Sequence, residues 1–153
     1  MNNNDILKSL RYTFDYGDDQ MIKLFKQGGR ETDREEVSNW LKKEEDEAYK
    51  PIYDIDLAAF LNGFIIKHRG KQDGKEPVPE KRLNNNTIFR KLKIALELKD
   101  ADILQILDDA DFRFSKHELS AIFRKPTQSQ YRDCKDQVLR YFLRGLQVKY
   151  RND

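Results

Sequence analysis

The hydrophobic positions of this chain follow a helical period from one end to the other. In residues 6–14 and again in residues 57–64, apolar side chains recur at three- and four-residue spacing, which places them on one face of a helix. No stretch of useful length alternates apolar and polar residues as a half-buried strand would. The pattern therefore predicts an all-α fold.

The same pattern occurs twice. When the chain is shifted by 82 positions against itself, Asn2–Asn4 align with Asn84–Asn86 without a gap, and the register continues to the last helix. In this alignment, apolar residues match apolar residues at nearly every core position between these ends. Identical pairs include Ile6 with Ile88, Leu10 with Leu92, Glu36 with Glu118, Leu57 with Leu139, Phe60 with Phe142, and Gly63 with Gly145.

The duplication predicts two tandem copies of a four-helix unit of about 70 residues. The first copy spans residues 1–70, the connector residues 71–82, and the second copy residues 83–153. The connector is rich in charge, glycine and proline, so we expect it at the surface. Short loops between the helices favour antiparallel neighbours.

Polar residues mark the helix starts in each copy. One asparagine of each triplet can cap the first helix, and Asp18 and Asp100 can cap the second. Asp33 with Glu36, and Ser115 with Glu118, have the spacing of a capping box before the third helix. The fourth helix is predicted to begin near Asp54 and Asp136, and Gly28 with Gly29 to end the second helix of the first copy.

Gly63 and Gly145 lie inside the fourth helix of each copy, where glycine costs about 1 kcal/mol relative to alanine. Close approach of another helix would explain both residues. We therefore expect each glycine at a tight helix crossing.

Composition and targeting signals point to a folded cytoplasmic protein. Charged residues make up 37% of the chain, but nine Phe, seven Tyr and one Trp supply enough apolar surface for a core. The single cysteine, Cys134, cannot form an internal disulfide, and the first ten residues lack the pattern of a secretory signal. No apolar run reaches the roughly 20 residues that a membrane span needs, so we expect no membrane role.

The segments "NNDILKSLRYTFDYGDDQMIKLF" and "LNNNTIFRKLKIALELKDADILQIL", with the endings "FLNGFIIK" and "FLRGLQVK", resemble the YehS-like family of uncharacterised bacterial proteins. The resemblance extends over essentially the whole chain. It implies a bacterial cytosolic protein with a duplicated helical domain and no established activity, substrate or cofactor.

Few residues offer catalytic chemistry. His68, His117 and Cys134 have no second ligand type at metal-binding spacing, and neither a nucleophile elbow nor a phosphate-binding loop is present. We therefore expect no enzymatic activity, no metal and no cofactor.

The two copies differ in net charge. Residues 1–70 carry a net charge of −3, and residues 83–153 a net charge of +4. The basic excess concentrates in the last helix, where Arg140, Arg144 and Arg151 share one stripe and Lys149 lies nearby. These four residues are the candidate phosphate-binding site, although a solvated helix face is the favoured explanation of them.

Two binding functions come first, and an enzyme is the third hypothesis, because it would require a deep pocket with perturbed titratable groups. A doubled helical unit without catalytic residues suggests a non-enzymatic adaptor that binds another protein, and this is the favoured interpretation. Nucleic-acid binding through the basic second copy is the alternative. The oligomeric state is open, because opposite charges on the two copies also permit head-to-tail self-association.

Overall fold

The computed structural model describes residues 1–72, 74 and 76–151, and these residues form eight helices and no strand. The predicted all-α fold with two four-helix units is confirmed. The helices of the first unit are α1 (Asn3–Thr13), α2 (Asp18–Gln27), α3 (Arg34–Leu41) and α4 (Asp54–Arg69). Those of the second are α5 (Asn85–Ala95), α6 (Asp100–Asp109), α7 (Lys116–Ile122) and α8 (Asp136–Tyr150).

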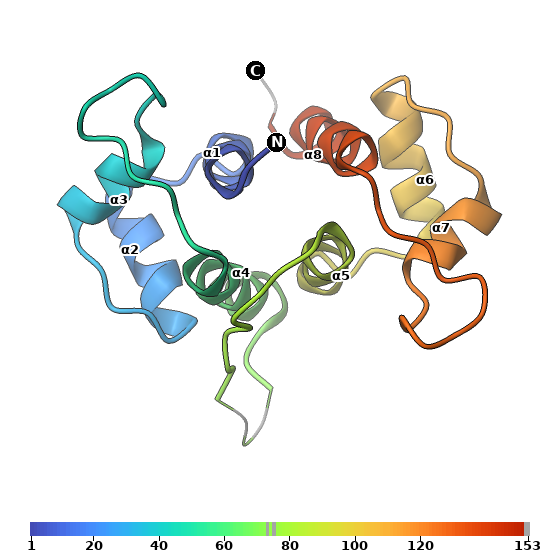
Figure 1. The fold of residues 1–153 in the computed structure, drawn as a ribbon, viewed down its shortest axis with the longest axis horizontal. Coiled ribbons are helices and arrows are strands. Elements are labelled where there is room, and N and C mark those ends of the chain that lie inside the picture. Colours follow the sequence, from blue (N-terminus) through green and yellow to red (C-terminus); the bar gives the residue numbers. More distant parts are fainter. Residues whose placement is uncertain (73, 75, 152–153) are drawn as a thin grey trace.

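The two units share a central bundle of four helices. In Figure 1, α1 and α4 from the first unit lie beside α8 and α5 from the second, while α2 with α3 and α6 with α7 cover the two outer sides. A half-turn about the viewing direction exchanges the units, so that α1 takes the place of α5 and α4 that of α8. The contacts of α4 with α5 and of α1 with α8 join the units.

All four central helices run in the same direction. Asn3, at the start of α1, donates to Asp54 at the start of α4, and Phe14 at the end of α1 contacts His68 near the end of α4. Asn85 likewise donates to Asp136, which pairs the starts of α5 and α8. The expectation of antiparallel neighbours is wrong for these helices, because two short helices intervene between α1 and α4 and return the chain to its starting end.

The outer helix α2 does cross α4 in the opposite direction, as expected. Gly28 at the end of α2 lies against Ala59 early in α4, and Leu24 lies against Gly63 one turn later. A Cβ added at Gly63 would stand 1.8 Å from the Leu24 carbonyl oxygen, and one at Gly145 would stand 2.3 Å from that of Ile106. Both glycines thus lie at close helix crossings, which confirms the prediction.

Most helix starts agree with the sequence pattern. Asn2 and Asn84 are the N-caps of α1 and α5, and Asp33 and Ser115 are those of α3 and α7. The prediction was wrong for the second helix of each copy, whose N-caps are Gly17 and Lys99. Asp18 and Asp100 are instead the first helical residues, where their negative charge interacts favourably with the helix dipole.

The third asparagine of each triplet is buried and holds an irregular segment in place. Asn4 donates to the carbonyl oxygens of Trp40 and Lys50, at 2.9 Å each, and accepts from the Ile52 amide. Asn86 repeats these bonds with Ile122, Arg132 and Cys134. One side chain thus satisfies three backbone groups that the segment before the fourth helix would otherwise leave unpaired.

The second asparagine fixes the start of the fourth helix. Asp54 accepts from Asn3 at 2.7 Å and from the Leu83 amide at 2.9 Å, so this carboxylate joins the start of α4 to the first residue of the second copy. Asp136 accepts from Asn85 at 2.7 Å and lies 3.7 Å from the Met1 nitrogen. The hydrogen bond from Asn85 lowers the pKa of Asp136.

Parallel packing dictates the path of the connector. Since α4 ends and α5 begins at opposite ends of the bundle, the chain must return along its length after Gly70. Figure 1 shows it returning beneath α4 and α5. Pro77, Pro79 and Glu80 are half-buried there, whereas Val78 is 82% exposed, so the surface location is confirmed for the described residues.

Gly63→Ala should destabilise the fold even though alanine is the better helix former. The added methyl group would collide with the backbone of α2, which cannot move aside as a flexible side chain can. We expect the free energy of unfolding to fall by about 1 to 3 kcal/mol in urea denaturation. Gly17→Ser, at an N-cap with open space around it, is the control and should not lower stability. A Gly63→Ala protein as stable as the wild type would contradict the packing explanation.

Candidate binding site

The structure divides the predicted arginine stripe. Arg151 is directed at the first unit, where its guanidinium lies 3.8 Å from the centre of the Tyr12 ring and 3.7 Å from Asp15. It also donates to the Tyr12 carbonyl oxygen. Arg151 therefore ties the end of α8 to the end of α1.

Arg140 and Arg144 both line a groove between α1 and α8. The groove has a volume of about 310 Å³. Both arginines are exposed, and among the described residues neither forms a hydrogen bond or an ion pair with another side chain. The remaining lining residues are Met1, Asp5, Ser9, Leu143 and Gln147.

Lys149 does not extend this pair of arginines. Its amino group lies 5.7 Å from the centre of the neighbouring Tyr150 ring, and at about 100° per residue it is well away from Arg144 around the helix. The structure thus brings together two of the four residues proposed from the sequence, Arg140 and Arg144, and gives Arg151 a role between the units.

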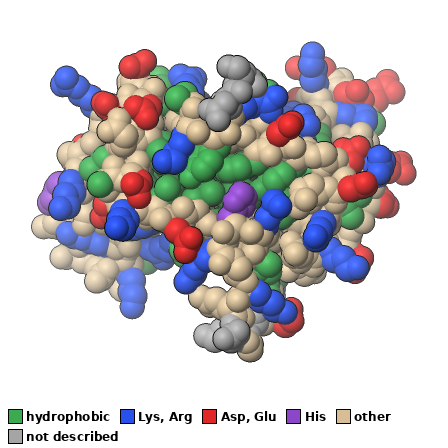
Figure 2. Space-filling view, turned by 180° about the vertical axis from the view of Figure 1, so that it is seen from behind, with side chains coloured by type: hydrophobic (Ala, Val, Ile, Leu, Met, Phe, Trp, Pro, Cys, Tyr) green, Lys and Arg blue, Asp and Glu red, His purple; other side chains and the backbone are tan. Residues whose placement is uncertain are grey.

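The ends of the central helices form a second candidate surface, seen in Figure 2. Because the four helices are parallel, their C-terminal ends meet on one face, and hydrophobic side chains gather at its centre with a histidine beside them. We define the terminal patch as Phe14, His68, Leu96 and Tyr150, one half-buried residue from the end of each central helix. Phe14 is equivalent to Leu96 and His68 to Tyr150, so both copies contribute the same positions.

Aromatic contacts hold the terminal patch together across the units. The Phe14 ring lies 5.1 Å from that of Tyr150 and 5.0 Å from that of His68, and the Tyr16 hydroxyl lies 2.6 Å from His68 Nε2. Burial lowers the pKa of His68, and the charge of Lys67 adds to the effect. Burial also raises the pKa of Tyr16. The neutral forms of both side chains are therefore favoured in the folded protein.

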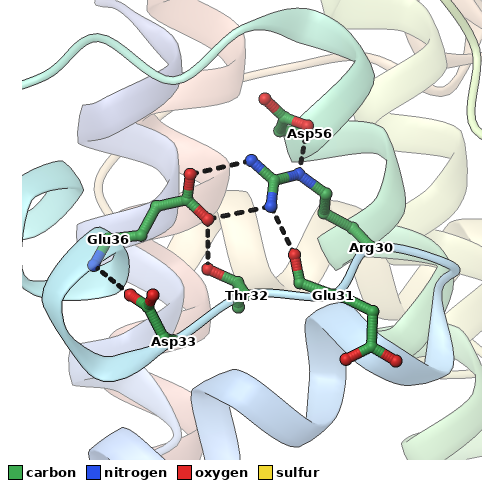
Figure 3. Close-up of polar contacts among 6 residues, drawn as sticks. All are labelled: Arg30, Glu31, Thr32, Asp33, Glu36 and Asp56. Carbon is green, nitrogen blue, oxygen red and sulfur yellow. Dashed lines mark hydrogen bonds and ion pairs between the residues drawn. The ribbon is translucent and has the colours of Figure 1, made fainter.

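An ionic network in the first unit has no counterpart in the second. Figure 3 shows Arg30 bound to both carboxylate oxygens of Glu36 and, through Nε, to Asp56 at 2.9 Å. The bond to Arg30 lowers the pKa of Glu36, and Thr32 also donates to this carboxylate. This network fastens the α2–α3 loop to α4.

At the equivalent place in the second unit, Phe112 replaces Arg30. Its ring stacks on Tyr141 with the centres 4.8 Å apart. The guanidinium of Arg144 then lies 4.8 Å from the centre of the Tyr141 ring. The two copies thus share a backbone arrangement and differ in the chemistry of their surfaces.

The other candidates from the sequence do not assemble into a site. Cys134 is buried, and burial raises the pKa of its thiol to about 12, so it is a poor nucleophile. In the part of the chain that the structure describes, no three His, Cys, Asp or Glu side chains are placed to hold a metal ion. No helix within these residues is long and apolar enough to cross a membrane.

Repeat and fold together define a class of protein: a tandem all-α protein whose two four-helix units share a parallel core. A family described as a protein of unknown function, DUF1456, matches residues 3–70 and again residues 85–152. The chain belongs to this family. The uncharacterised protein YehS of Escherichia coli (strain K12) is 42% identical over 150 residues, which cover 97% of this chain and 96% of YehS. No solved structure matches.

The terminal patch was not predicted from the sequence. Its residues were recognisable as ends of apolar helix faces, but only the parallel direction of the helices brings these ends together. The repeat did contain one indication of the patch: Phe14 and Leu96 are both apolar, at equivalent positions just after a helix.

His68 should make the stability of the protein depend on pH. Since its pKa is lowered on folding, the unfolded chain binds the proton more readily, and stability is fully present above the ordinary value of about 6.5 and falls as the pH drops below it. His68→Gln keeps a polar partner for Tyr16 and does not titrate. We expect its urea midpoint to fall less than that of the wild type between about pH 7.5 and 5.5. Equal falls in the two proteins would refute this role.

Proposed function

We propose that this protein is a non-enzymatic adaptor that binds another protein through the terminal patch. The observation that carries the proposal is a contiguous group of hydrophobic side chains at the centre of one face, supplied by equivalent positions of both copies. Exposed apolar patches with polar rims are typical of protein interaction sites.

Charge around the patch indicates the chemistry of the partner. The exposed cations Lys67, Arg69 and Lys149 surround the helix ends, where they also interact favourably with the helix dipoles. The acidic residues Asp15 and Glu97 follow α1 and α5. Asp15 lies near Arg151, which compensates its charge. The patch therefore suits a partner surface with an apolar side chain flanked by carboxylates.

The pKa shifts of Tyr16, His68, Cys134 and Glu36 have structural causes, and this supports the binding function over an enzymatic one. Tyr16 and His68 hydrogen-bond to each other, and Cys134 is buried. Glu36 is neutralised by Arg30. None of these four pKa shifts requires a catalytic role.

A pull-down of the full-length tagged chain from its native cell extract, with and without nuclease, tests the proposal. We expect a protein partner that survives nuclease treatment and whose recovery falls about tenfold or more with Leu96→Glu, because the change buries a charge in an apolar interface. Tyr53→Glu is the matched control: Tyr53 is 70% exposed and lies at the opposite end of the bundle, before α4.

Circular dichroism must show that both variants remain folded. A partner recovered equally with Leu96→Glu would place the interface elsewhere and contradict the proposal. Loss of all partners on nuclease treatment would favour nucleic-acid binding instead.

A further inference from the structure

The connector occupies a groove between α4 and α5. Glu80 forms an ion pair of 2.9 Å with Lys91 of α5, and Lys91 donates to Asn62 of α4 at 2.6 Å. Pro77 lines the same groove together with Ile65 of α4. An extended segment containing prolines and a carboxylate thus binds between two parallel central helices.

The half-turn that exchanges the units maps this occupied groove onto the groove between α1 and α8. Asn62 corresponds to Arg144, and Lys91 to Ser9. Each groove therefore has one basic side chain at this position: Lys91 on α5 in the first groove, and Arg144 on α8 in the second. Glu80 forms an ion pair with Lys91 in the first groove, whereas no described residue forms an ion pair with Arg144 in the second.

Of the two arginines in the α1/α8 groove, Arg144 has no carboxylate partner among the described residues, whereas the charge of Arg140 acts on Asp136 and contributes to lowering its pKa. Asp5 accepts from the Asn2 amide at 3.0 Å and completes the N-cap of α1. Asp136 accepts from Asn85 and lies near the Met1 nitrogen. The guanidinium of Arg144 lies over the Tyr141 ring. This contact involves one face of the guanidinium, so the N–H donors at its edge can still form hydrogen bonds.

We propose that the α1/α8 groove binds an extended acidic segment of a partner protein, with carboxylates at Arg140 and Arg144, in the way that the connector binds between α4 and α5. The α1/α8 groove is a different surface from the terminal patch, so this inference goes beyond the proposed function. An experiment can contradict either one without contradicting the other. Arginine suits this ligand, because its planar guanidinium binds carboxylates with two parallel hydrogen bonds.

An acidic peptide fits the groove better than a nucleic-acid backbone does. Arg151 is engaged with Tyr12 and Asp15, so the stripe does not continue as a track of cations along α8. Two adjacent arginines can instead bind two carboxylates separated by a short extended segment.

Fluorescence anisotropy with a labelled peptide of sequence Glu-Pro-Val-Pro-Glu-Glu, which extends residues 76–80 of the connector by one glutamate, tests the inference on the full-length protein. We expect weak binding at low salt that loosens about tenfold between 50 and 300 mM salt, because the contacts are ionic and exposed. A peptide with glutamine in place of glutamate should bind at least about tenfold more weakly.

Arg140→Glu with Arg144→Glu should abolish binding while the circular dichroism signal remains that of the wild type, since both side chains are exposed. Lys23→Glu, an exposed charge reversal on α2, is the control and should bind as the wild type does. Absence of peptide binding at 50 mM salt would overturn the inference. Equal binding by the double variant would also overturn it, as would an oligonucleotide that displaces the peptide and binds more tightly through the same two arginines.

Discussion

The buried asparagines Asn4 and Asn86 impose the constraint on which the rest of the fold depends. Between the third and fourth helices the chain forms no helix and is mostly exposed, but it returns to the core at Ile52, where buried backbone groups need internal partners. Asn4 satisfies the Trp40, Lys50 and Ile52 groups, and Asn86 repeats the arrangement. These bonds set where the fourth helix begins. They thereby place the Asp54 carboxylate beside Asn3, which makes the first and fourth helices parallel.

Parallel packing has two consequences for function. The ends of four helices converge on one face and create the terminal patch, and the chain must travel back along α4 to begin α5, which places the connector in one of two equivalent grooves. Divergence between the copies then decides what each surface offers. Arg30 with its carboxylates is replaced by an aromatic stack, and Asn62 by Arg144, so a symmetric frame presents different surfaces on its two sides.

Much of this fold could be predicted from the sequence, because helix periodicity and capping are local. The repeat, the caps at Asn2 and Ser115, and the tight packing of Gly63 all followed from spacing alone. The direction of non-consecutive helices did not, since periodicity identifies an apolar face without identifying what covers it. The role of Arg151 was hidden for the same reason: its partner, the Tyr12 carbonyl, lies 139 positions away in the chain.

The central claim is that the two copies share one core and unfold together. The chain has a single tryptophan, Trp40, which is buried in the first unit against Phe25, so its fluorescence reports on that unit alone. Asn86→Ala removes the side chain that bonds the backbone groups of Ile122, Arg132 and Cys134 in the second unit. If the core is shared, the urea midpoint followed by Trp40 fluorescence should fall with this substitution and coincide with the midpoint from circular dichroism. An unchanged Trp40 midpoint beside a lowered circular dichroism midpoint would show that the copies unfold independently and contradict the account.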